Sequence, residues 1–130
     1  MAVLQRILLV DDEKDIRQIA RLSLESLGGF HIDECPSGLE APAAATRYEP
    51  DLILMDVMMP GQDGPTTLKA LRAAPGLAHI PVIFMTAKVQ PQEVAALRNL
   101  GALDVIAKPF DPMTLAQTVR RIWDGLPQQA

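Results

Sequence analysis

The chain has 130 residues, of which 48% are hydrophobic and 22% charged, and its formal net charge is -4. This length suits one domain with a single buried core, and the acidic balance argues against a nucleic-acid-binding surface, which needs clustered Lys and Arg. The longest apolar runs are far too short to span a membrane, and the N-terminus lacks the apolar stretch of a signal peptide. We therefore expect a cytoplasmic protein that binds neither nucleic acid nor membrane.

Short runs rich in Val, Ile and Leu alternate along the chain with longer segments whose apolar residues recur at helical spacing. This alternation is typical of a parallel sheet covered by helices on both faces. The expected strands are Arg6–Val10, Phe30–Glu34, Leu52–Met55, Val82–Met85 and Asp104–Ala107. Five such units predict an α/β, flavodoxin-like, doubly wound five-stranded parallel sheet of order 2-1-3-4-5 with five helices. Ligands would bind beyond the carboxyl ends of strands 1 and 3.

The first two helices have recognisable boundaries. The first predicted helix ends at Gly28 and Gly29, which supply the backbone freedom that a helix end needs. Its inner stripe is expected to consist of Ile16, Ile19, Ala20, Leu24 and Leu27. For the second helix, Ser37 and Glu40 have the spacing of a capping box, but Pro42 would then lie inside the helix. A start near Ala41 removes this conflict.

The remaining helices follow turn residues. The third should begin near Pro65, after Gly64, and the fourth should run from near Pro91 to Gly101. For the last helix we predict Asp111 as the N-cap and Pro112 at the first helical position. Its inner face would carry Leu115, Val119 and Ile122. The only cysteine, Cys35, excludes an intrachain disulfide and is expected to be a small buried hydrophobe.

Polar residues whose side chains can take part in chemistry follow four of the predicted strands: Asp11 and Asp12, Asp56, Thr86, and Lys108. Parallel strands point their carboxyl ends the same way, so these side chains should meet at one edge of the sheet. Two carboxylates 4 Å apart repel by about 4 kcal/mol at an effective dielectric near 20, so a cation is needed. Oxygen ligands with no His or Cys nearby favour Mg²⁺.

A carboxylate beside a metal and a lysine can act as a nucleophile toward a phosphoryl group. Asp56 is the candidate acceptor, Lys108 could neutralise developing charge, and Thr86 offers a hydroxyl donor. Each residue also has a structural interpretation: acids are favoured at helix starts, Asp56 could form an Asx-turn, and Thr86 could bond to backbone. The coincidence at four strand ends favours the functional interpretation.

Four motifs carry a resemblance to the receiver domain of two-component response regulators: LLVDDE at 8–13, DLILMDVMMPGQDG at 51–64, MTA at 85–87 and KPF at 108–110. The likeness runs from Ile7 to about Trp123. We therefore expect a receiver domain at 1–124, followed at 125–130 by a frayed tail or the start of a linker.

The resemblance implies roles for individual residues. Asp11, Asp12, Asp56 and the backbone carbonyl of Met58 would hold Mg²⁺. Asp56 would be the phosphoacceptor for a sensor histidine kinase or phosphotransfer protein, which would dock on the first helix and the loop after the fifth strand. Thr86 and Lys108 would contact the phosphoryl group, and the Lys108–Pro109 peptide bond would be cis. Phosphorylation would then alter a surface that binds a downstream protein.

One position departs from the family pattern. Val105 stands at the switch position three residues before Lys108, where Tyr or Phe is common, so we expect activation to move the loop after Thr86 more than any side chain on the fifth strand. Met58 and Lys88 occupy the positions that tune phosphoryl hydrolysis in the family, and an apolar Met58 could shield the site. Both could equally be solvent-facing loop residues.

Two rival functions are kept. Haloacid-dehalogenase-like phosphatases, which are enzymes, also use an Asp nucleophile and Mg²⁺, but carry an Asp-x-Asp motif after the first strand, where this chain has adjacent Asp11 and Asp12. A phosphate-independent interaction module is favoured only by Val105. We expect a signalling protein rather than an enzyme, either a stand-alone regulator or a receiver excised from a longer protein. The sequence names neither the kinase nor the downstream protein.

Overall fold

The computed structural model describes residues 3–126, and within them five strands alternate with five helices. The strands are β1 (Arg6–Val10), β2 (His31–Cys35), β3 (Leu52–Asp56), β4 (Val82–Thr86) and β5 (Asp104–Ala107). The helices are α1 (Lys14–Gly28), α2 (Ala41–Tyr48), α3 (Gly64–Ala73), α4 (Pro91–Asn99) and α5 (Leu115–Asp124). The tail expected at 125–130 lies outside the described residues from 127 onward.

Neighbouring strands pair in parallel throughout the sheet, whose order is β2-β1-β3-β4-β5. The predicted flavodoxin-like order is therefore confirmed. The chain moves outward from β1 in one direction and from β3 in the other, so the loops after these two strands diverge. A crevice opens between such loops, at the carboxyl edge of the sheet.

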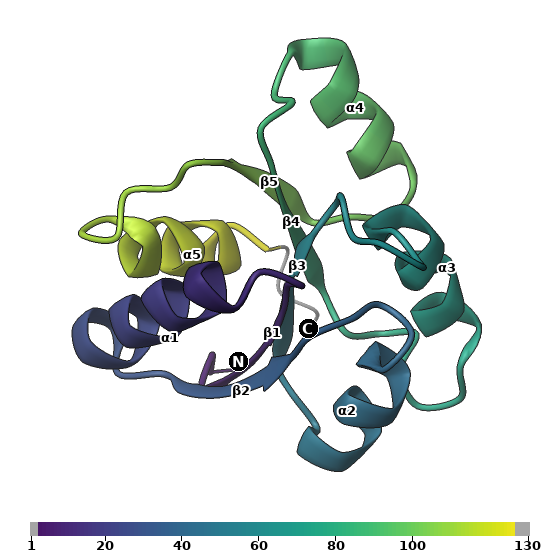
Figure 1. Cartoon of the computed structure of the whole chain (residues 1–130), viewed down its shortest axis with the longest axis horizontal. Coiled ribbons are helices and arrows are strands. Elements are labelled where there is room, and N and C mark those ends of the chain that lie inside the picture. Colours follow the sequence, from purple (N-terminus) through teal and green to yellow (C-terminus); the bar gives the residue numbers. More distant parts are fainter. Residues whose placement is uncertain (1–2, 127–130) are drawn as a thin grey trace.

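The sheet separates two apolar cores. Figure 1 shows α1 and α5 on one face of the sheet and α2, α3 and α4 on the other. Leu8 and Val10 pack into the core beneath α2, α3 and α4, whereas Ile7 and Leu9 pack beneath α1 and α5. Because both faces of β3 are covered, all of its residues are buried, which explains its continuous apolar run.

Helix α4 is the least embedded helix. Only Leu97 of its residues is buried, and Figure 1 shows the helix projecting away from the other helices. Its C-terminal side is fixed by an ion pair between Arg98 and Asp104, 2.6 Å apart, at the start of β5. This attachment is weak, since an exposed ion pair contributes little stability.

The strand boundaries differ from the prediction at three places. β2 is His31–Cys35 rather than Phe30–Glu34, because Phe30 turns into the core from the loop after α1. Asp56 and Thr86 are the last residues of β3 and β4 and do not follow them. Their backbones belong to the sheet, which fixes where both side chains point.

The expected inner stripe of α1 is partly wrong. Ala20 and Leu24 are buried, but Ile19 and Leu27 are about half exposed. Ser23 is buried in their place because its hydroxyl donates a hydrogen bond to the carbonyl of Pro112, in the loop before α5. This polar contact joins α1 to the loop before α5.

Helix ends were predicted with mixed success. α2 begins at Ala41 with Pro42 in its first turn, as expected, and the Ser37 and Glu40 side chains bond to each other just before it. α3 begins at Gly64 and α4 ends at Asn99, two residues before Gly101. The predicted N-cap of α5 is wrong: Thr114 occupies it.

Asp111 has another local role near α5. Its carboxylate accepts the amide of Met113 at 2.9 Å, and so closes a turn that precedes the helix. The inner face of α5 is as predicted, with Leu115 and Val119 buried and Ile122 packed against the same core. Cys35 is buried, as expected. Across residues 3–126, every helix is too short or too polar to cross a membrane.

Candidate functional site

Four acidic side chains meet at the carboxyl edge of the sheet: Asp11, Asp12, Glu13 and Asp56. One carboxylate oxygen of each lies within 4.8 Å of the others. Asp11 and Asp56 are buried, whereas Asp12 and Glu13 are exposed at the rim. The fold therefore brings together the three predicted acids, and Glu13 joins them because it is the next residue in the same loop.

Lys108 supplies the positive charge of this cluster. Its ammonium nitrogen lies 2.9 Å from Asp11 Oδ2 and 3.4 Å from Asp56 Oδ1. Burial alone would lower the pKa of Lys108, but the hydrogen bond and charge of Asp11, together with the charge of Asp56, raise it above the ordinary value. The lysine is therefore a permanent cation in this site.

The negative charge of the Asp56 carboxylate is only partly neutralised by its surroundings. Burial raises its pKa above the ordinary value, and the charge of Asp11 raises it further, whereas Lys108 and the backbone amide of Met58 act in the opposite direction. One lysine thus does not fully neutralise two buried acids. The all-oxygen donor set, half buried and half open to solvent, fits Mg²⁺, which accepts a few carboxylates and keeps several waters.

Thr86 is buried at the end of β4, next to β3 in the sheet. Its hydroxyl oxygen accepts the amide of Lys88 at 3.1 Å. Within residues 3–126 that hydroxyl has no acceptor for its own proton. It is available as a donor to an oxygen placed beside Asp56.

The remaining predicted residues lie around this cluster. The Lys108–Pro109 peptide bond is cis. The side chains of Met58 and Lys88 are exposed. Val105 is half buried on β5, beside Phe84 of β4, and packs against the core that contains Leu97.

Gly64 allows the loop after β3 to close over the site. A Cβ atom at this position would lie 2.6 Å from the backbone oxygen of Asp56 and 2.7 Å from the Phe84 ring. The Gly64 amide donates to the carbonyl of Val57 at 2.8 Å, which brings the loop back to the end of the strand. The second glycine of the GQDG segment is thus required by close packing.

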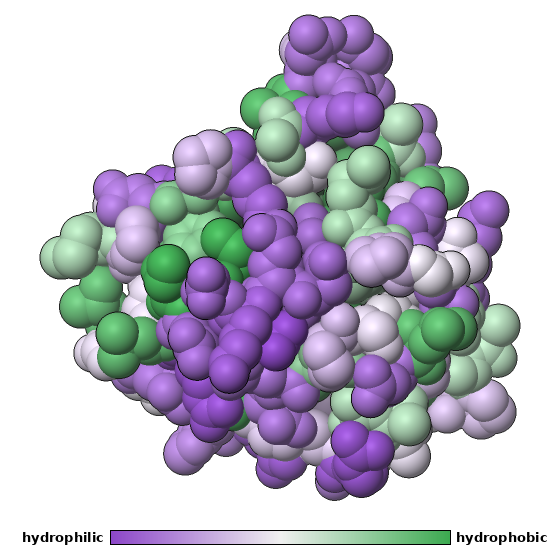
Figure 2. All heavy atoms as spheres, in the orientation of Figure 1, coloured by the Kyte–Doolittle hydropathy of each residue, from purple (hydrophilic) through white to green (hydrophobic). Residues whose placement is uncertain are grey.

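An apolar cavity of about 330 Å³ adjoins the acidic cluster. Lys108 and Glu13 line its polar side, and Ile16, Ile19 and Phe110 are among its apolar walls. Figure 2 shows hydrophilic residues across the middle of this face of the molecule, with hydrophobic residues gathered beside them. An apolar surface next to a charged site suits a protein partner.

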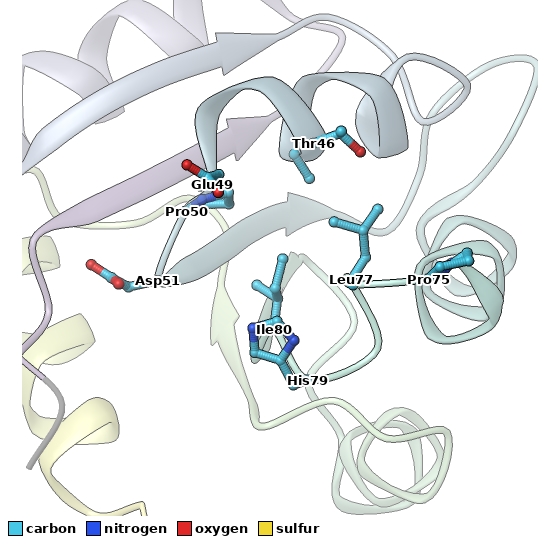
Figure 3. A pocket seen from close by; sticks show the side chains of 10 residues that line it. Thr46, Glu49, Pro50, Asp51, Pro75, Leu77, His79 and Ile80 are labelled. Carbon is cyan, nitrogen blue, oxygen red and sulfur yellow. The ribbon is translucent and has the colours of Figure 1, made fainter.

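A second cavity, of about 370 Å³, lies at the opposite edge of the sheet. Figure 3 shows Thr46, Leu77, His79 and Ile80 around it, and shows the Asp51 carboxylate directed away from it. Among residues 3–126, the lining of this cavity has no counterpart of the cluster around Lys108.

Sequence reasoning missed Arg17. Its guanidinium donates to the backbone carbonyl of Asp11 at 2.7 Å and to Glu34 at 3.1 Å. The spacing from Glu13, one helical turn earlier, places Arg17 near the start of α1. No sequence signal reveals a bond between a side chain and a backbone carbonyl six residues away.

Strand order, acid cluster and paired lysine together define a receiver module of two-component signalling. The family model of the response regulator receiver domain matches residues 7–120, and the chain belongs to that family.

Relatives with known descriptions agree with this assignment. The chain is 36% identical over 128 residues to the DNA-binding dual master transcriptional regulator RpaA of Synechocystis sp., covering 96% of this chain and 53% of that protein. It is 36% identical over 116 residues to the DNA-binding response regulator MtrA of Mycobacterium tuberculosis, covering 89% of this chain and 49% of that protein. The chain thus spans about half the length of the curated relatives it matches.

Among solved structures, the chemotaxis response regulator CheY4 of Vibrio cholerae superposes with a TM-score of 0.84 at 31% identity. That alignment covers 92% of this chain and 99% of the other. A response regulator from Desulfuromonas acetoxidans gives a TM-score of 0.81 at 32% identity, with 95% and 99% covered.

Proposed function

We propose that Asp56 accepts a phosphoryl group from a histidine kinase or phosphotransfer protein, in an Mg²⁺-dependent reaction in the cytoplasm. The observation that carries this proposal is the position of Asp56. It ends a fully buried strand, 3.4 Å from the Lys108 ammonium, and shares one cluster with Asp11 and Asp12.

The transfer balances simply. A carboxylate oxygen of Asp56 bonds to phosphorus while the bond from phosphorus to the donor imidazole nitrogen breaks, and the imidazole keeps the electron pair. Asp11, Asp12, Asp56 and the backbone carbonyl of Met58 would hold Mg²⁺, which when bound supplies positive charge for the phosphoryl oxygens.

Lys108 and Thr86 would bind the transferred group. The Lys108 ammonium, already charged and held by Asp11, needs little movement to reach a phosphoryl oxygen on Asp56. The free proton of the Thr86 hydroxyl would donate to a second oxygen. The chain's own residues thus offer two donors, from β4 and from the loop after β5.

The phosphoryl donor would dock beside the site. Lys108 and Glu13 line the apolar cavity next to the acids. Ala87, after β4, forms one of its other walls, and the rest come from α1 and the loop after β5. These are the segments that the family resemblance implies for the kinase. Burying that cavity would also exclude water from the acceptor.

The response would travel through the loop after Thr86. The Thr86 hydroxyl accepts the Lys88 amide, so a Thr86 that turns toward a phosphoryl group releases this loop and the start of α4. Val105 carries no ring that could swing inward, and α4 buries only Leu97, with the Arg98–Asp104 ion pair at its C-terminal side. We expect an activated structure to show the loop at 87–90 displaced further than any β5 side chain; an unmoved loop would disprove this.

The acceptor role is tested by incubating the purified protein with acetyl phosphate and Mg²⁺ and measuring its intact mass. The wild type should gain one phosphoryl group, and the Asp56→Asn variant should gain none. A gain that persists in the variant, or no gain in the wild type, would refute the proposal. Turnover of para-nitrophenyl phosphate by the wild type would instead favour the phosphatase.

A further inference from the structure

We propose that Arg17 is a positioning residue that orients the Asp11–Asp12 peptide, and with it the Asp12 carboxylate, for cation binding. Arg17 lies outside the acidic cluster, yet its Nη1 donates to the backbone oxygen of Asp11 at 2.7 Å. The inference rests on the proposed function, because it assumes that the acidic cluster binds a divalent cation.

The other contacts of Asp11 show why this bond matters. The Asp11 amide donates to Cys35 at 3.1 Å, and its side chain accepts from Glu13 at 2.8 Å and from Lys108 at 2.9 Å. Arg17 satisfies the one remaining group, the carbonyl. Since a peptide unit is planar, fixing that oxygen fixes the orientation of the Asp12 amide as well.

Asp12 depends on this restraint. It is exposed, and among residues 3–126 its carboxylate has no hydrogen-bond or ion-pair partner. Its place in the acidic cluster is therefore set by the backbone that carries it. If the Asp11–Asp12 peptide rotated, Asp12 would leave the cluster without losing any side-chain contact.

Arg17 is itself held in place from β2. Its Nε pairs with Glu34 Oε1 at 3.1 Å, and the second oxygen of Glu34 pairs with Arg21 at 2.8 Å. Only 14% of the Arg17 side chain is exposed, whereas 41% of Arg21 is. Arg21 shares the same acid but makes no contact with Asp11, so it is the matched control.

An electrostatic role and a positioning role for Arg17 predict opposite changes in Mg²⁺ affinity when Arg17 is removed. Arg17 is a cation near a cation site, so removing it should tighten Mg²⁺ binding if its charge were what mattered. Some residues orient the metal ligands from outside the coordination sphere, and their loss usually weakens metal binding 10- to 100-fold. We expect Arg17→Met to raise the Mg²⁺ dissociation constant roughly tenfold, and Arg21→Gln to change it less than twofold.

The experiment is calorimetric Mg²⁺ titration of the wild type, Arg17→Met, Arg17→Lys and Arg21→Gln. It is accompanied by hydrogen exchange of the Glu13 amide without metal, which reports the Glu13–Asp11 bond directly. Arg17→Met should speed this exchange and Arg21→Gln should not. Arg17→Lys should recover part of the affinity, since an ammonium can still donate to the Asp11 carbonyl.

Unaltered or tighter Mg²⁺ binding by Arg17→Met, with unchanged Glu13 exchange, would overturn the inference. If the wild type bound no Mg²⁺, the proposed function would fail. The Glu13 exchange would still decide whether Arg17 holds this loop. A urea titration of each variant shows that the folded state is being compared.

Discussion

An aspartate lies at each end of strand β3, Asp51 just before it and Asp56 at its carboxyl end, and the two have different surroundings. Asp51, just before the strand, accepts the backbone amides of Gln5 at 3.0 Å and Arg6 at 2.9 Å. Asp56, its last residue, lies instead beside Asp11 and Lys108. A carboxylate whose acceptors are used by backbone amides fastens the fold, whereas one that faces another acid is a candidate for chemistry.

The largest expected effect comes from removing the cation at the Asp56 edge. Lys108→Met leaves Asp11, which is fully buried, without its ion pair. Removing one partner of a buried pair costs about 3 to 5 kcal/mol. We expect urea unfolding without metal to show a loss of about 3 kcal/mol, and Mg²⁺ to restore part of it. Equal stability of variant and wild type would show that the acids do not depend on Lys108.

At the opposite edge, Asp51→Ala should destabilise the protein by about 1 to 2 kcal/mol, because two backbone amides lose a charged acceptor. Mg²⁺ should leave this loss unchanged, since the side chain points away from its nearby cavity and lies far along β3 from the cluster. Urea unfolding with and without Mg²⁺ measures both. If Mg²⁺ restored the stability of Asp51→Ala, the two ends of β3 would not differ in the way described.

Asp56→Asn should have the opposite sign. Because burial and Asp11 raise the pKa of Asp56, its ionised form destabilises the folded, metal-free protein. We expect the variant to be more stable by about 1 kcal/mol at neutral pH. The advantage should vanish as pH falls through the raised pKa, where the folded wild type takes up a proton. Urea titrations across this pH range test the sign; a variant less stable at neutral pH would contradict it.

The smallest effect is expected at Glu49, which lies in the left-handed region with φ of 53°. Glycine relieves a conformational cost of about 1 to 2 kcal/mol there but adds about 0.5 to 1 kcal/mol of unfolded-state entropy. Glu49→Gly should therefore raise the free energy of unfolding by a few tenths of a kcal/mol and leave phosphorylation unaffected. Thermal unfolding measures this change. A loss of stability would contradict the prediction and indicate that the Glu49 side chain makes stabilising contacts.

The sequence sufficed for the fold and for three members of the acidic cluster, Asp11, Asp12 and Asp56, but not for Glu13. Buried parallel strands leave a strong apolar signal, and topology alone brings their carboxyl ends together. The sequence did not predict Ser23 inside α1 or the contact of Arg17 with Asp11, because both involve side-chain bonds to backbone carbonyls. Such acceptors exist at every residue, so only the folded geometry selects one.

The start of α5 illustrates a second limit. Asp111 and Pro112 have the residue types of a helix start, and they form a turn instead. Local capping preferences are worth about 1 kcal/mol, which the packing of neighbouring segments readily outweighs. In the same way Val105 can be read from the sequence as a departure from the family, but its packing against the core of Leu97 cannot.

The central claim is that the carboxyl-edge aspartate of β3 accepts the phosphoryl group. The most direct measurement is to phosphorylate the wild type with acetyl phosphate and Mg²⁺ and reduce the acyl phosphate with borohydride, which converts the modified aspartate to homoserine. Peptide sequencing by mass spectrometry then locates it. We predict homoserine at position 56 and unmodified aspartate at 11, 12 and 51. Homoserine at any of those three positions, with Asp56 intact, would contradict the claim.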